Sequence, residues 1–367
     1  MCVPVASLGR AKCDLDTPAL VVDLAALERN ISTMASRIRG AGVEWRPHIK
    51  GQKVPAIARM ALQVGAIGVT CAKLGEAEVM AAAGIEDILI ANQIAGPQKL
   101  ARLMNLLDCA DVKVAVDSVD HVLALSAAAQ AHSARLRVVV EVDIGMQRCG
   151  VQPGLPVVEL ARRVQAAPGL TFAGLMAWEA QCTRILNQPD KHECIRQAVE
   201  LLTSSARLCR EAGAPVEIVS CGGTGTYTIA ATIPGVTEIQ AGGGVFNDVL
   251  YAEQCGLDHE FALTVLTTVI SRPTPKRIVV DAGRKAMSCD MATPRPLGLV
   301  GVESVTLSAE HGRIELEQPN TKVKVGDKVE FIVGYSDTTV FLHDEMYAVR
   351  DGQVETVWPI LARGKLR

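Results

Sequence analysis

The stretch EWRPHIKGQK, residues 44–53, lies between an amphipathic helical pattern and a helical pattern of small residues. Pro47 disfavours helical geometry at Arg46 and has no backbone N–H, so the stretch is predicted to be extended. Lys50 then lies near the end of a short strand, at the entry to the next helix. A lysine there can point into a pocket, lose its water and attack a carbonyl as the free amine. Because most lysines are exposed, the alternative is a solvated patch of Arg46, Lys50 and Lys53.

The composition is that of a compact enzyme. At 367 residues the chain exceeds one average domain and is predicted to form two. Hydrophobic residues make up 49% and charged residues 21%. A net charge of -3 provides no basic field for nucleic acid, and no apolar run is long enough to cross a bilayer. We therefore expect no nucleic-acid partner and no membrane.

The start of the chain and the cysteines bear on the compartment. Residues 1–7, MCVPVAS, lack the charged and apolar regions of a secretory signal. The chain has 11 cysteines, with no CxxC pair and no zinc-finger spacing. We interpret them as reduced thiols and expect a bacterial-type cytoplasmic enzyme.

Short apolar strands alternate with alanine-rich helices as far as residue 247. Strands that are apolar on both faces suit a parallel sheet buried on both sides. The alternation amounts to about eight β/α units over roughly 240 residues, as in a TIM-type (β/α)8 barrel. A doubly wound open sheet is the rival, but its G-x-G-x-x-G fingerprint is missing.

The pattern changes after Asn247, where strands alternate with Gly, Pro and Asn turns. This pattern predicts a C-terminal β-domain of about 115 residues with only strands in it. The fold class is therefore α/β, with a barrel over 16–247 and a β-domain over 248–367. The N-terminal segment 1–15 is a candidate to join the β-domain.

Two glycine-rich loops follow the last two predicted barrel strands: SCGGTGT at 220–226 and QAGGG at 240–244. Their backbone N–H groups can approach an anion, and Thr224 and Thr226 add hydroxyl donors. Barrel enzymes commonly hold a phosphate at this place. Ordinary tight turns are the alternative, and a Walker loop is excluded because no Gly-Lys-Ser/Thr follows.

A reactive lysine opposite a phosphate cradle implies a phosphorylated carbonyl held as a Schiff base, and pyridoxal phosphate is the common cofactor of that description.

Motifs spread over nearly the whole chain carry a family resemblance. They are DTPAL (16–20), RPHIK (46–50), CAKLGEA (71–77), EVDIG (141–145), RCGV (148–151), GGTG (222–225), TEIQAG (237–242), DAG (281–283), EHG (310–312) and ARG (362–364). With them the chain resembles the fold-type III pyridoxal-phosphate enzymes, which combine an alanine racemase-like barrel with a β-domain. Within these it is most similar to the group of D-threonine aldolase, 3-hydroxy-D-aspartate aldolase and D-serine dehydratase.

The resemblance implies roles for particular residues. Lys50 would carry the cofactor, and Arg148 would reach the cofactor region. Trp178 stands where the family has an aromatic residue after the sixth strand, with a core tryptophan as the alternative. The remaining residues implied for the cofactor site are His48, Gly223, Thr224, Gly225, Gln240, Gly242 and Gly243.

The departures from the family concern a divalent metal, Mn, Mg or Zn. The family carries a His-x-Asp or His-x-Cys pair in the late β-domain, whereas this chain has Tyr335 and Asp337. A phenol is a poor metal ligand at neutral pH. The family pattern Tyr-His-Gly with a later His reads WEAQCTR at 178–184, so both histidines are missing. We therefore expect weak or absent metal dependence, and a new ligand set of Asp337, Glu179 and His343 is the alternative.

The implied reaction is retro-aldol cleavage of a D-configured β-hydroxy-α-amino acid to glycine and an aldehyde. Without a metal, Tyr335 or Arg184 would bind a substrate group directly, and Arg184 could pair with a carboxylate or phosphate in bidentate fashion. β-Elimination, or racemisation with Lys50 and Tyr335 as the acid/base groups, is the second interpretation. A non-catalytic protein that binds pyridoxal phosphate is the third. The resemblance also implies a homodimer acting on a small amino-acid substrate.

Overall fold

The computed structural model describes residues 8–367 and divides into two compact units. The barrel unit comprises residues 32–50, 55–242 and 364–367, and the β-unit comprises 8–31, 51–54 and 243–363. Compared with the predicted ranges 16–247 and 248–367, residues 16–31, 51–54 and 243–247 belong to the β-unit and residues 364–367 to the barrel unit. Of the segment 1–15, residues 8–15 belong to the β-unit and residues 1–7 lie outside the described part of the chain.

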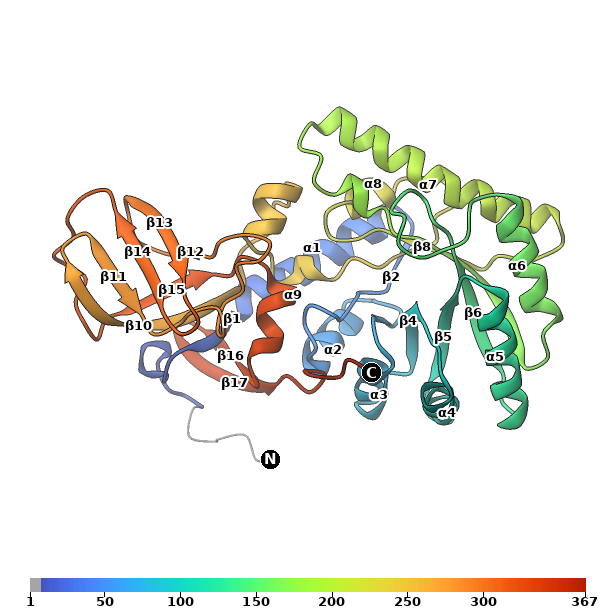
Figure 1. Cartoon of the computed structure of the whole chain (residues 1–367), viewed down its shortest axis with the longest axis horizontal. Coiled ribbons are helices and arrows are strands. Elements are labelled where there is room, and N and C mark those ends of the chain that lie inside the picture. The colour runs from blue at the N-terminus through green and yellow to red at the C-terminus, as the bar shows by residue number, and fades with distance from the viewer. Residues whose placement is uncertain (1–7) are drawn as a thin grey trace. The chain divides into compact units, whose positions relative to one another are not determined.

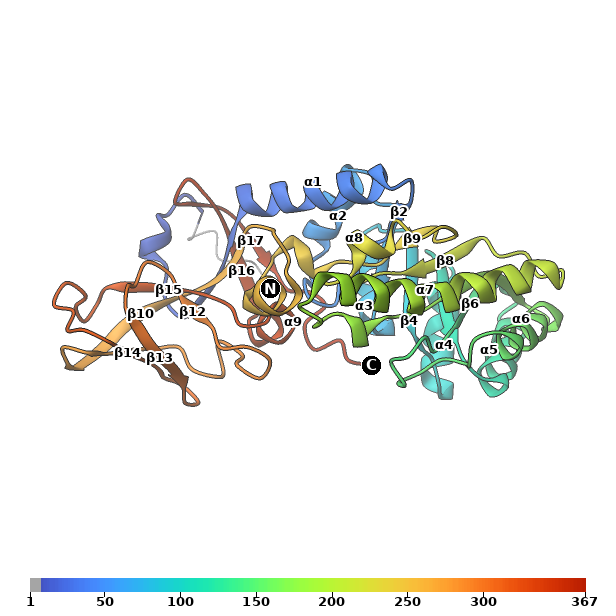
Figure 2. The same ribbon diagram turned by 90° about the horizontal axis from the view of Figure 1, so that it is seen from above.

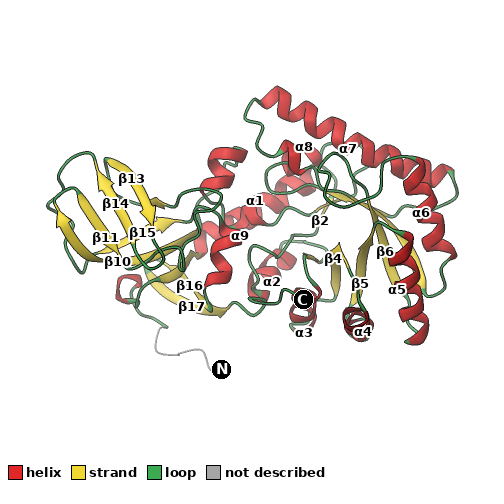
Figure 3. Ribbon diagram, in the orientation of Figure 1, coloured by secondary structure: helices red, strands yellow, loops and turns green. Residues whose placement is uncertain are grey.

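Eight parallel strands form the sheet of the barrel unit in the order β2-β9-β8-β7-β6-β5-β4-β3. Val138, Val139 and Val140 in its middle are all 0% exposed, as expected for a sheet covered on both faces. Figure 3 shows helices lying outside these strands. The strands are β2 (Glu44–Trp45), β3 (Val69–Cys71), β4 (Asp87–Gln93), β5 (Asp111–Val116), β6 (Leu136–Glu141), β7 (Leu170–Met176), β8 (Ile218–Cys221) and β9 (Glu238–Ile239).

Residues 45–49 join the two ends of this strand order. On one side, three backbone hydrogen bonds of 2.8–2.9 Å link them to residues 67–70. On the other side, the N–H groups of Arg46 and His48 donate to the carbonyls of Ile239 and Gln240, each over 2.9 Å. The extended conformation predicted for this stretch is confirmed, and so is the TIM-type, alanine racemase-like barrel.

The helices of the chain begin and end close to the expected positions (Figure 1). One exception is α7, which begins at Gln188 rather than near His192 because the Asn187 side chain caps it by accepting from the Asp190 N–H. The helices are α1 (Leu24–Gly40), α2 (Pro55–Gln63), α3 (Leu74–Ala82), α4 (Pro97–Leu106), α5 (Val119–Ala131), α6 (Leu155–Ala166), α7 (Gln188–Glu211) and α8 (Tyr227–Ala230).

The β-unit is built on a nine-stranded sheet (Figure 2). The first strand of the chain belongs to it, because β1 (Ala19–Asp23) pairs antiparallel with β10 and parallel with β16. The expectation of strands alone after residue 247 is wrong, since η5 (Leu250–Gln254), α9 (Ser336–Thr339) and η6 (Val340–Leu342) interrupt them. The other strands are β10 (Leu263–Thr274), β11 (Arg277–Val280), β12 (Arg295–Pro296), β13 (Val302–Leu307), β14 (Gly312–Leu316), β15 (Lys328–Ile332), β16 (Glu345–Arg350) and β17 (Gln353–Pro359).

A buried ion network ties the amino ends of the barrel strands together. The Arg46 guanidinium lies between Asp87 and Glu238, the first residues of β4 and β9, and its Nε is 3.1 Å from Glu238 Oε1. Lys113 on β5 bonds Asp87 and Asp111 over 2.6 and 2.7 Å. The side chains of Arg46 and Lys113 are only 3% and 1% exposed, so solvent screens their charges less than those of exposed ion pairs.

Arg46→Met should therefore destabilise the protein strongly. The change leaves the buried Glu238 carboxylate without its cation, and the free energy of unfolding should fall by about 3–5 kcal/mol in denaturant titrations. Arg137→Met is the matched control, because Arg137 pairs with Asp111 and Glu217, which are 50% and 72% exposed. The control should lose less than about 1 kcal/mol. Equal losses in the two variants would contradict this account.

Candidate active site

Five neighbouring strands of the barrel unit bring the predicted site residues to one end of the sheet. Because β2, β9, β8, β7 and β6 are parallel, the loops after them leave from the same edge. Lys50 follows β2, and the loop of residues 222–226, called here the glycine loop, follows β8. Trp178 follows β7 and Arg148 follows β6. The carboxyl end of the barrel thus carries most of the residues predicted for the cofactor.

Lys50 is exposed, and its backbone N–H donates to His48 Nδ1 over 3.4 Å. The loop after β9 approaches this segment closely: a Cβ on Gly242 would lie 2.0 Å from the His48 carbonyl oxygen. Only glycine fits at that distance. The glycine at position 242 is thus required by the packing of the β9 loop on the segment that ends in Lys50.

Trp178 and the glycine loop are also in close contact. A Cβ on Gly223 would lie 1.9 Å from Cη2 of Trp178, so the indole occupies the space that a side chain would need. Trp178 is only partly buried. The structure therefore brings together two of the residues predicted for the cofactor.

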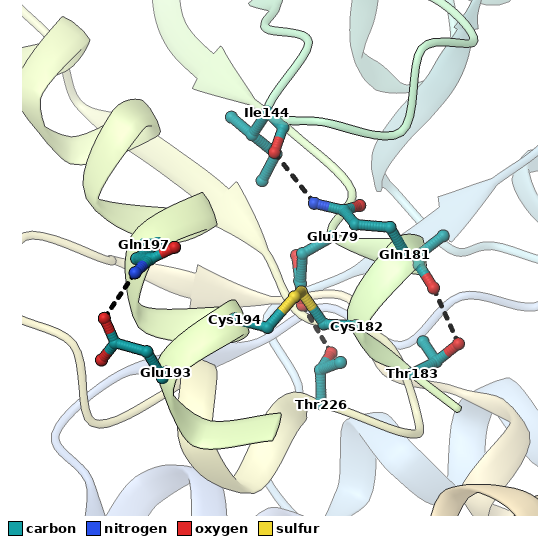
Figure 4. Close-up of a disulfide and its surroundings, with 10 residues drawn as sticks. Ile144, Glu179, Gln181, Cys182, Thr183, Glu193, Cys194, Gln197 and Thr226 are labelled. Atoms are coloured by element: carbon teal, nitrogen blue, oxygen red, sulfur yellow. Dashed lines mark hydrogen bonds between the residues drawn. A yellow bond between two sulfur atoms is a disulfide. The ribbon is translucent and has the colours of Figure 1, made fainter. Parts of the chain in front are cut away.

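The glycine loop folds around a buried carboxylate. Glu179 is 0% exposed, and its oxygens accept hydrogen bonds from the Thr226 hydroxyl over 2.5 Å and from the Gly222 N–H over 3.4 Å. Burial raises the pKa of Glu179, and the hydrogen bonds oppose that rise. Thr226 was expected to offer its hydroxyl to a bound anion; instead the hydroxyl points at Glu179 (Figure 4).

Arg148 lies beside a small depression. Its Nη2 is 3.6 Å from Oε1 of Glu141, the last residue of β6, and Gln93 Nε2 donates to the other oxygen of Glu141 over 2.5 Å. Burial raises the pKa of Glu141. Glu141, the first residue of the EVDIG motif, pairs with the predicted arginine, and Gln93 bonds Glu141; sequence patterns do not predict either contact. The depression is lined by Glu141, Val142, Asp143, Ile144, Met146, Arg148, Cys149 and Trp178.

Tyr335 and Asp337 lie in the β-unit, at the start of α9. The Tyr335 ring meets the Tyr251 ring edge-on, with 5.8 Å between centroids. Burial, together with the charge of Asp337, raises the pKa of Tyr335 far above its usual range. The phenol therefore stays protonated at neutral pH, as a hydrogen-bond donor. Gly51 packs close to Asp337: a Cβ at that position would lie 2.3 Å from Asp337 Oδ1.

Asp248 supports this part of the β-unit and was not predicted. Its Oδ2 accepts from the N–H and the hydroxyl of Ser336, each over 2.8 Å, and its Oδ1 accepts from the Tyr251 N–H over 2.8 Å. Burial raises the pKa of Asp248 to about 7. The bond to the N–H three residues ahead is a helix N-cap pattern, which the sequence Asp-x-x could have indicated.

The structure does not form a metal site from the alternative ligands Asp337, Glu179 and His343. Within residues 8–367, no group of three or more His, Cys, Asp or Glu side chains could hold a metal ion. Glu179 bonds Thr226 and Gly222 as described, and His343 Nε2 lies 2.8 Å from the Ala286 carbonyl. Burial lowers the pKa of His343.

Arg184 is exposed, on the segment that follows β7 and η3 (Ala180–Cys182). A disulfide between Cys182 and Cys194 ties this segment to the first turns of α7 (Figure 4). The expectation that all cysteines are reduced is therefore wrong, because motif spacing does not reveal a pair joined across a loop and a helix. Disulfides persist mainly in oxidising compartments, so the cytoplasmic location stays a prediction. No helix in the described part of the chain has the length and hydropathy to span a membrane.

The residues of the barrel unit fit pyridoxal phosphate. Lys50 supplies an exposed amine after β2, and Gly223 and Gly242 allow backbone to come where any Cβ would clash. Lys50 would hold the carbonyl carbon of the cofactor, and the loops after β8 and β9 would receive its phosphate.

Lys50→Ala should abolish covalent retention of the cofactor, because the change removes the amine that would bond its carbonyl carbon. Wild-type protein should absorb at about 420 nm, and after borohydride reduction mass spectrometry should find the pyridoxyl group on the Lys50 peptide. Lys53→Ala, three positions away, is the control and should keep both signals. A reduced adduct in Lys50→Ala protein would remove Lys50 from this role.

Known proteins share both sequence and fold with this chain. The family profile "Alanine racemase, N-terminal domain" matches residues 22–248, and "Putative serine dehydratase domain" matches 262–349. D-threonine aldolase of Arthrobacter sp. is 38% identical, covering 98% of this chain and 96% of the relative. 3-Hydroxy-D-aspartate aldolase of Paracoccus denitrificans (strain Pd 1222) is also 38% identical, covering 97% and 94%. The crystal structure of D-threonine aldolase from Filomicrobium marinum superimposes with a TM-score of 0.95 at 36% identity, covering 98% of this chain and 99% of that one. The chain thus belongs to the alanine racemase-like, fold-type III family of pyridoxal-phosphate enzymes, with D-threonine aldolase and 3-hydroxy-D-aspartate aldolase among its close relatives.

Proposed function

We propose that this protein is a pyridoxal-phosphate-dependent lyase that cleaves a D-configured β-hydroxy-α-amino acid into glycine and an aldehyde. The observation that carries the proposal is 38% identity to D-threonine aldolase over 98% of the chain. The relative named 3-hydroxy-D-aspartate aldolase supports the same reaction class with a different substrate side chain. When bound, the cofactor supplies an electron sink that stabilises the carbanion left by Cα–Cβ cleavage.

In this proposal the residues of the chain bind and orient the cofactor. The Lys50 amine holds the cofactor, and Arg148, placed by Glu141, offers a cation at the carboxyl end of the barrel. Trp178 packs against Gly223 on one side of the loop. We assign phosphate binding to the loops after β8 and β9, with Gly223, Thr224, Gly225, Gln240 and Gly242, and Gly243 after them.

Tyr335 and Arg184 are the proposed substrate residues. Because the Tyr335 phenol stays protonated, it can donate a hydrogen bond to the β-hydroxyl oxygen, where the family uses a metal. Arg184 is exposed and can bind a side-chain carboxylate or phosphate through its planar guanidinium. The name of the 3-hydroxy-D-aspartate relative is consistent with a carboxylate.

β-Elimination is the second candidate reaction. The match of residues 262–349 to the putative serine dehydratase domain favours it, because that range contains Tyr335 and Asp337. Elimination would release ammonia and a keto acid, whereas aldol cleavage releases glycine and an aldehyde.

We also propose a cytoplasmic homodimer that acts on a small amino acid and needs no nucleic acid or membrane. Family membership supports the dimer, and so do apolar side chains exposed on the β-unit. Val300, Phe341 and Leu297 are 91%, 44% and 42% exposed. Sedimentation at micromolar concentration should give a dimer, and a fully active monomer would contradict this.

A substrate screen tests the reaction. D- and L-β-hydroxy amino acids are incubated with the protein, with and without a chelator, and the products are identified. We expect glycine and an aldehyde from D-substrates at a rate that the chelator changes by less than about twofold, since Tyr335 replaces the metal-binding imidazole. Keto acid and ammonia would establish the dehydratase reaction. The opposite enantiomer would establish a racemase, and the absence of any product would establish a non-catalytic binding protein.

Tyr335→His tests the interpretation of the lost metal site. The variant places an imidazole two positions from Asp337, and it should acquire a stoichiometric Mn²⁺ or Zn²⁺ in elemental analysis. Tyr335→Phe is the control and should acquire none. A stoichiometric ion in wild-type protein that disappears in Asp337→Asn would show that the site still binds metal with tyrosine present.

A further inference from the structure

We propose that Glu179 is a positioning residue that holds the glycine loop in the shape that binds the cofactor phosphate. This inference rests on the proposed function only in that the loop binds pyridoxal phosphate; it does not depend on which bond of the substrate is cleaved.

The contacts of the loop run through Glu179 and Thr226. Glu179 accepts from the Gly222 N–H and from the Thr226 hydroxyl, and Thr226 Oγ1 accepts in turn from the Gly223 N–H over 3.0 Å. The N–H groups of Thr226 and Tyr227 donate to the Gly223 carbonyl over 3.0 and 2.9 Å. Four N–H groups at the loop are thus engaged by protein acceptors, and this sets the path of the backbone between them.

Glu179 is itself fixed by neighbours other than the loop. Just before it, the Ala177 N–H donates to the Ser220 carbonyl over 3.0 Å. Just after it, Gln181 Nε2 donates to the Ile144 carbonyl over 2.9 Å, and Cys182 is bonded to Cys194 (Figure 4). The segment is held on both sides of Glu179. The carboxylate is therefore a fixed point for the loop.

The chemistry of Glu179 and the glycine loop also suits a phosphate site. The loop has polar N–H groups that would be costly to bury unpaired; Glu179 accepts from the Gly222 N–H directly and holds Thr226, whose Oγ1 accepts from the Gly223 N–H. The Glu179 carboxyl group lies at the loop that we assign to the phosphate, which is itself acidic. Burial raises the pKa of Glu179 and so favours its neutral, protonated form. A neutral amide of the same shape should therefore replace it, whereas a methyl group should not.

The test compares pyridoxal phosphate with pyridoxal, which lacks the phosphate, in titrations of the cofactor-stripped full-length protein. Glu179→Ala should raise the Kd for pyridoxal phosphate about 10–100-fold, because the Gly222 N–H and the Thr226 hydroxyl lose their acceptor. The Kd for pyridoxal should change by less than about threefold. Glu179→Gln should restore phosphate-dependent binding to within about threefold of wild type, since its amide oxygen can accept from Gly222 and its NH2 group can donate to Thr226.

Two further variants keep the test independent of whether Glu179→Ala folds. Thr226→Val removes the hydroxyl that links Glu179 to Gly223, and it should weaken phosphate-dependent binding in the same direction. The combined Glu179→Ala and Thr226→Val changes should cost less than the sum of the two, because both break one network. Thr183→Val is the matched control: its hydroxyl bonds only the Ala180 carbonyl among the described contacts, and binding should be unchanged.

Two results would overturn the inference. One is unchanged affinity for pyridoxal phosphate in Thr226→Val and in folded Glu179→Ala protein. The other is equal weakening of pyridoxal and pyridoxal phosphate, which would mean a general loss of structure. Wild-type protein that binds neither compound would instead overturn the proposed function together with this inference. Binding without any aldol product would leave the role of Glu179 intact and remove only the aldolase reaction.

Discussion

Pairing of residues 45–49 on both sides is the interaction on which the barrel unit depends. The N–H groups of Arg46 and His48 are directed to the β9 side, and the Pro47 carbonyl accepts from Thr70 on the β3 side. Pro47 has no N–H to contribute, so the closure uses its carbonyl alone. Because the strand leaves this double pairing in the direction common to all eight strands, Lys50 emerges at the same edge as the loops after β6 to β9.

Local sequence patterns predicted most elements but not all partners. Runs such as residues 136–141 and 328–332 alternate or stay apolar in ways typical of strands, and both are strands. The pairing of β1 with β10 and β16 joins residues far apart in sequence, which no local pattern can specify. The four-residue helix α9 is too short to show a helical period, so it was missed.

In the candidate site, too, residues in short motifs could be predicted from the sequence, whereas their contacts with distant residues could not. Lys50, Trp178 and the two glycine loops each lie in a short motif, and their positions after parallel strands brought them to one edge. The sequence indicates Glu179 only as an alternative metal ligand. Its hydrogen bond to Thr226 crosses 47 positions of sequence, which no local motif specifies. The Cys182–Cys194 pair is likewise a tertiary fact: the two residues are 12 apart and gave no recognisable motif.

The ion network of Arg46, Asp87, Glu238 and Lys113 lies at the amino ends of the strands, opposite the loops that carry the candidate site. Substitutions in those loops leave this network untouched. The segment 178–184 is such a loop, and it carries a fully buried acid, Glu179, without disturbing the barrel. Because the candidate site and the ion network lie at opposite ends of the barrel strands, substitutions that change substrate contacts at one end leave the stabilising contacts at the other end in place.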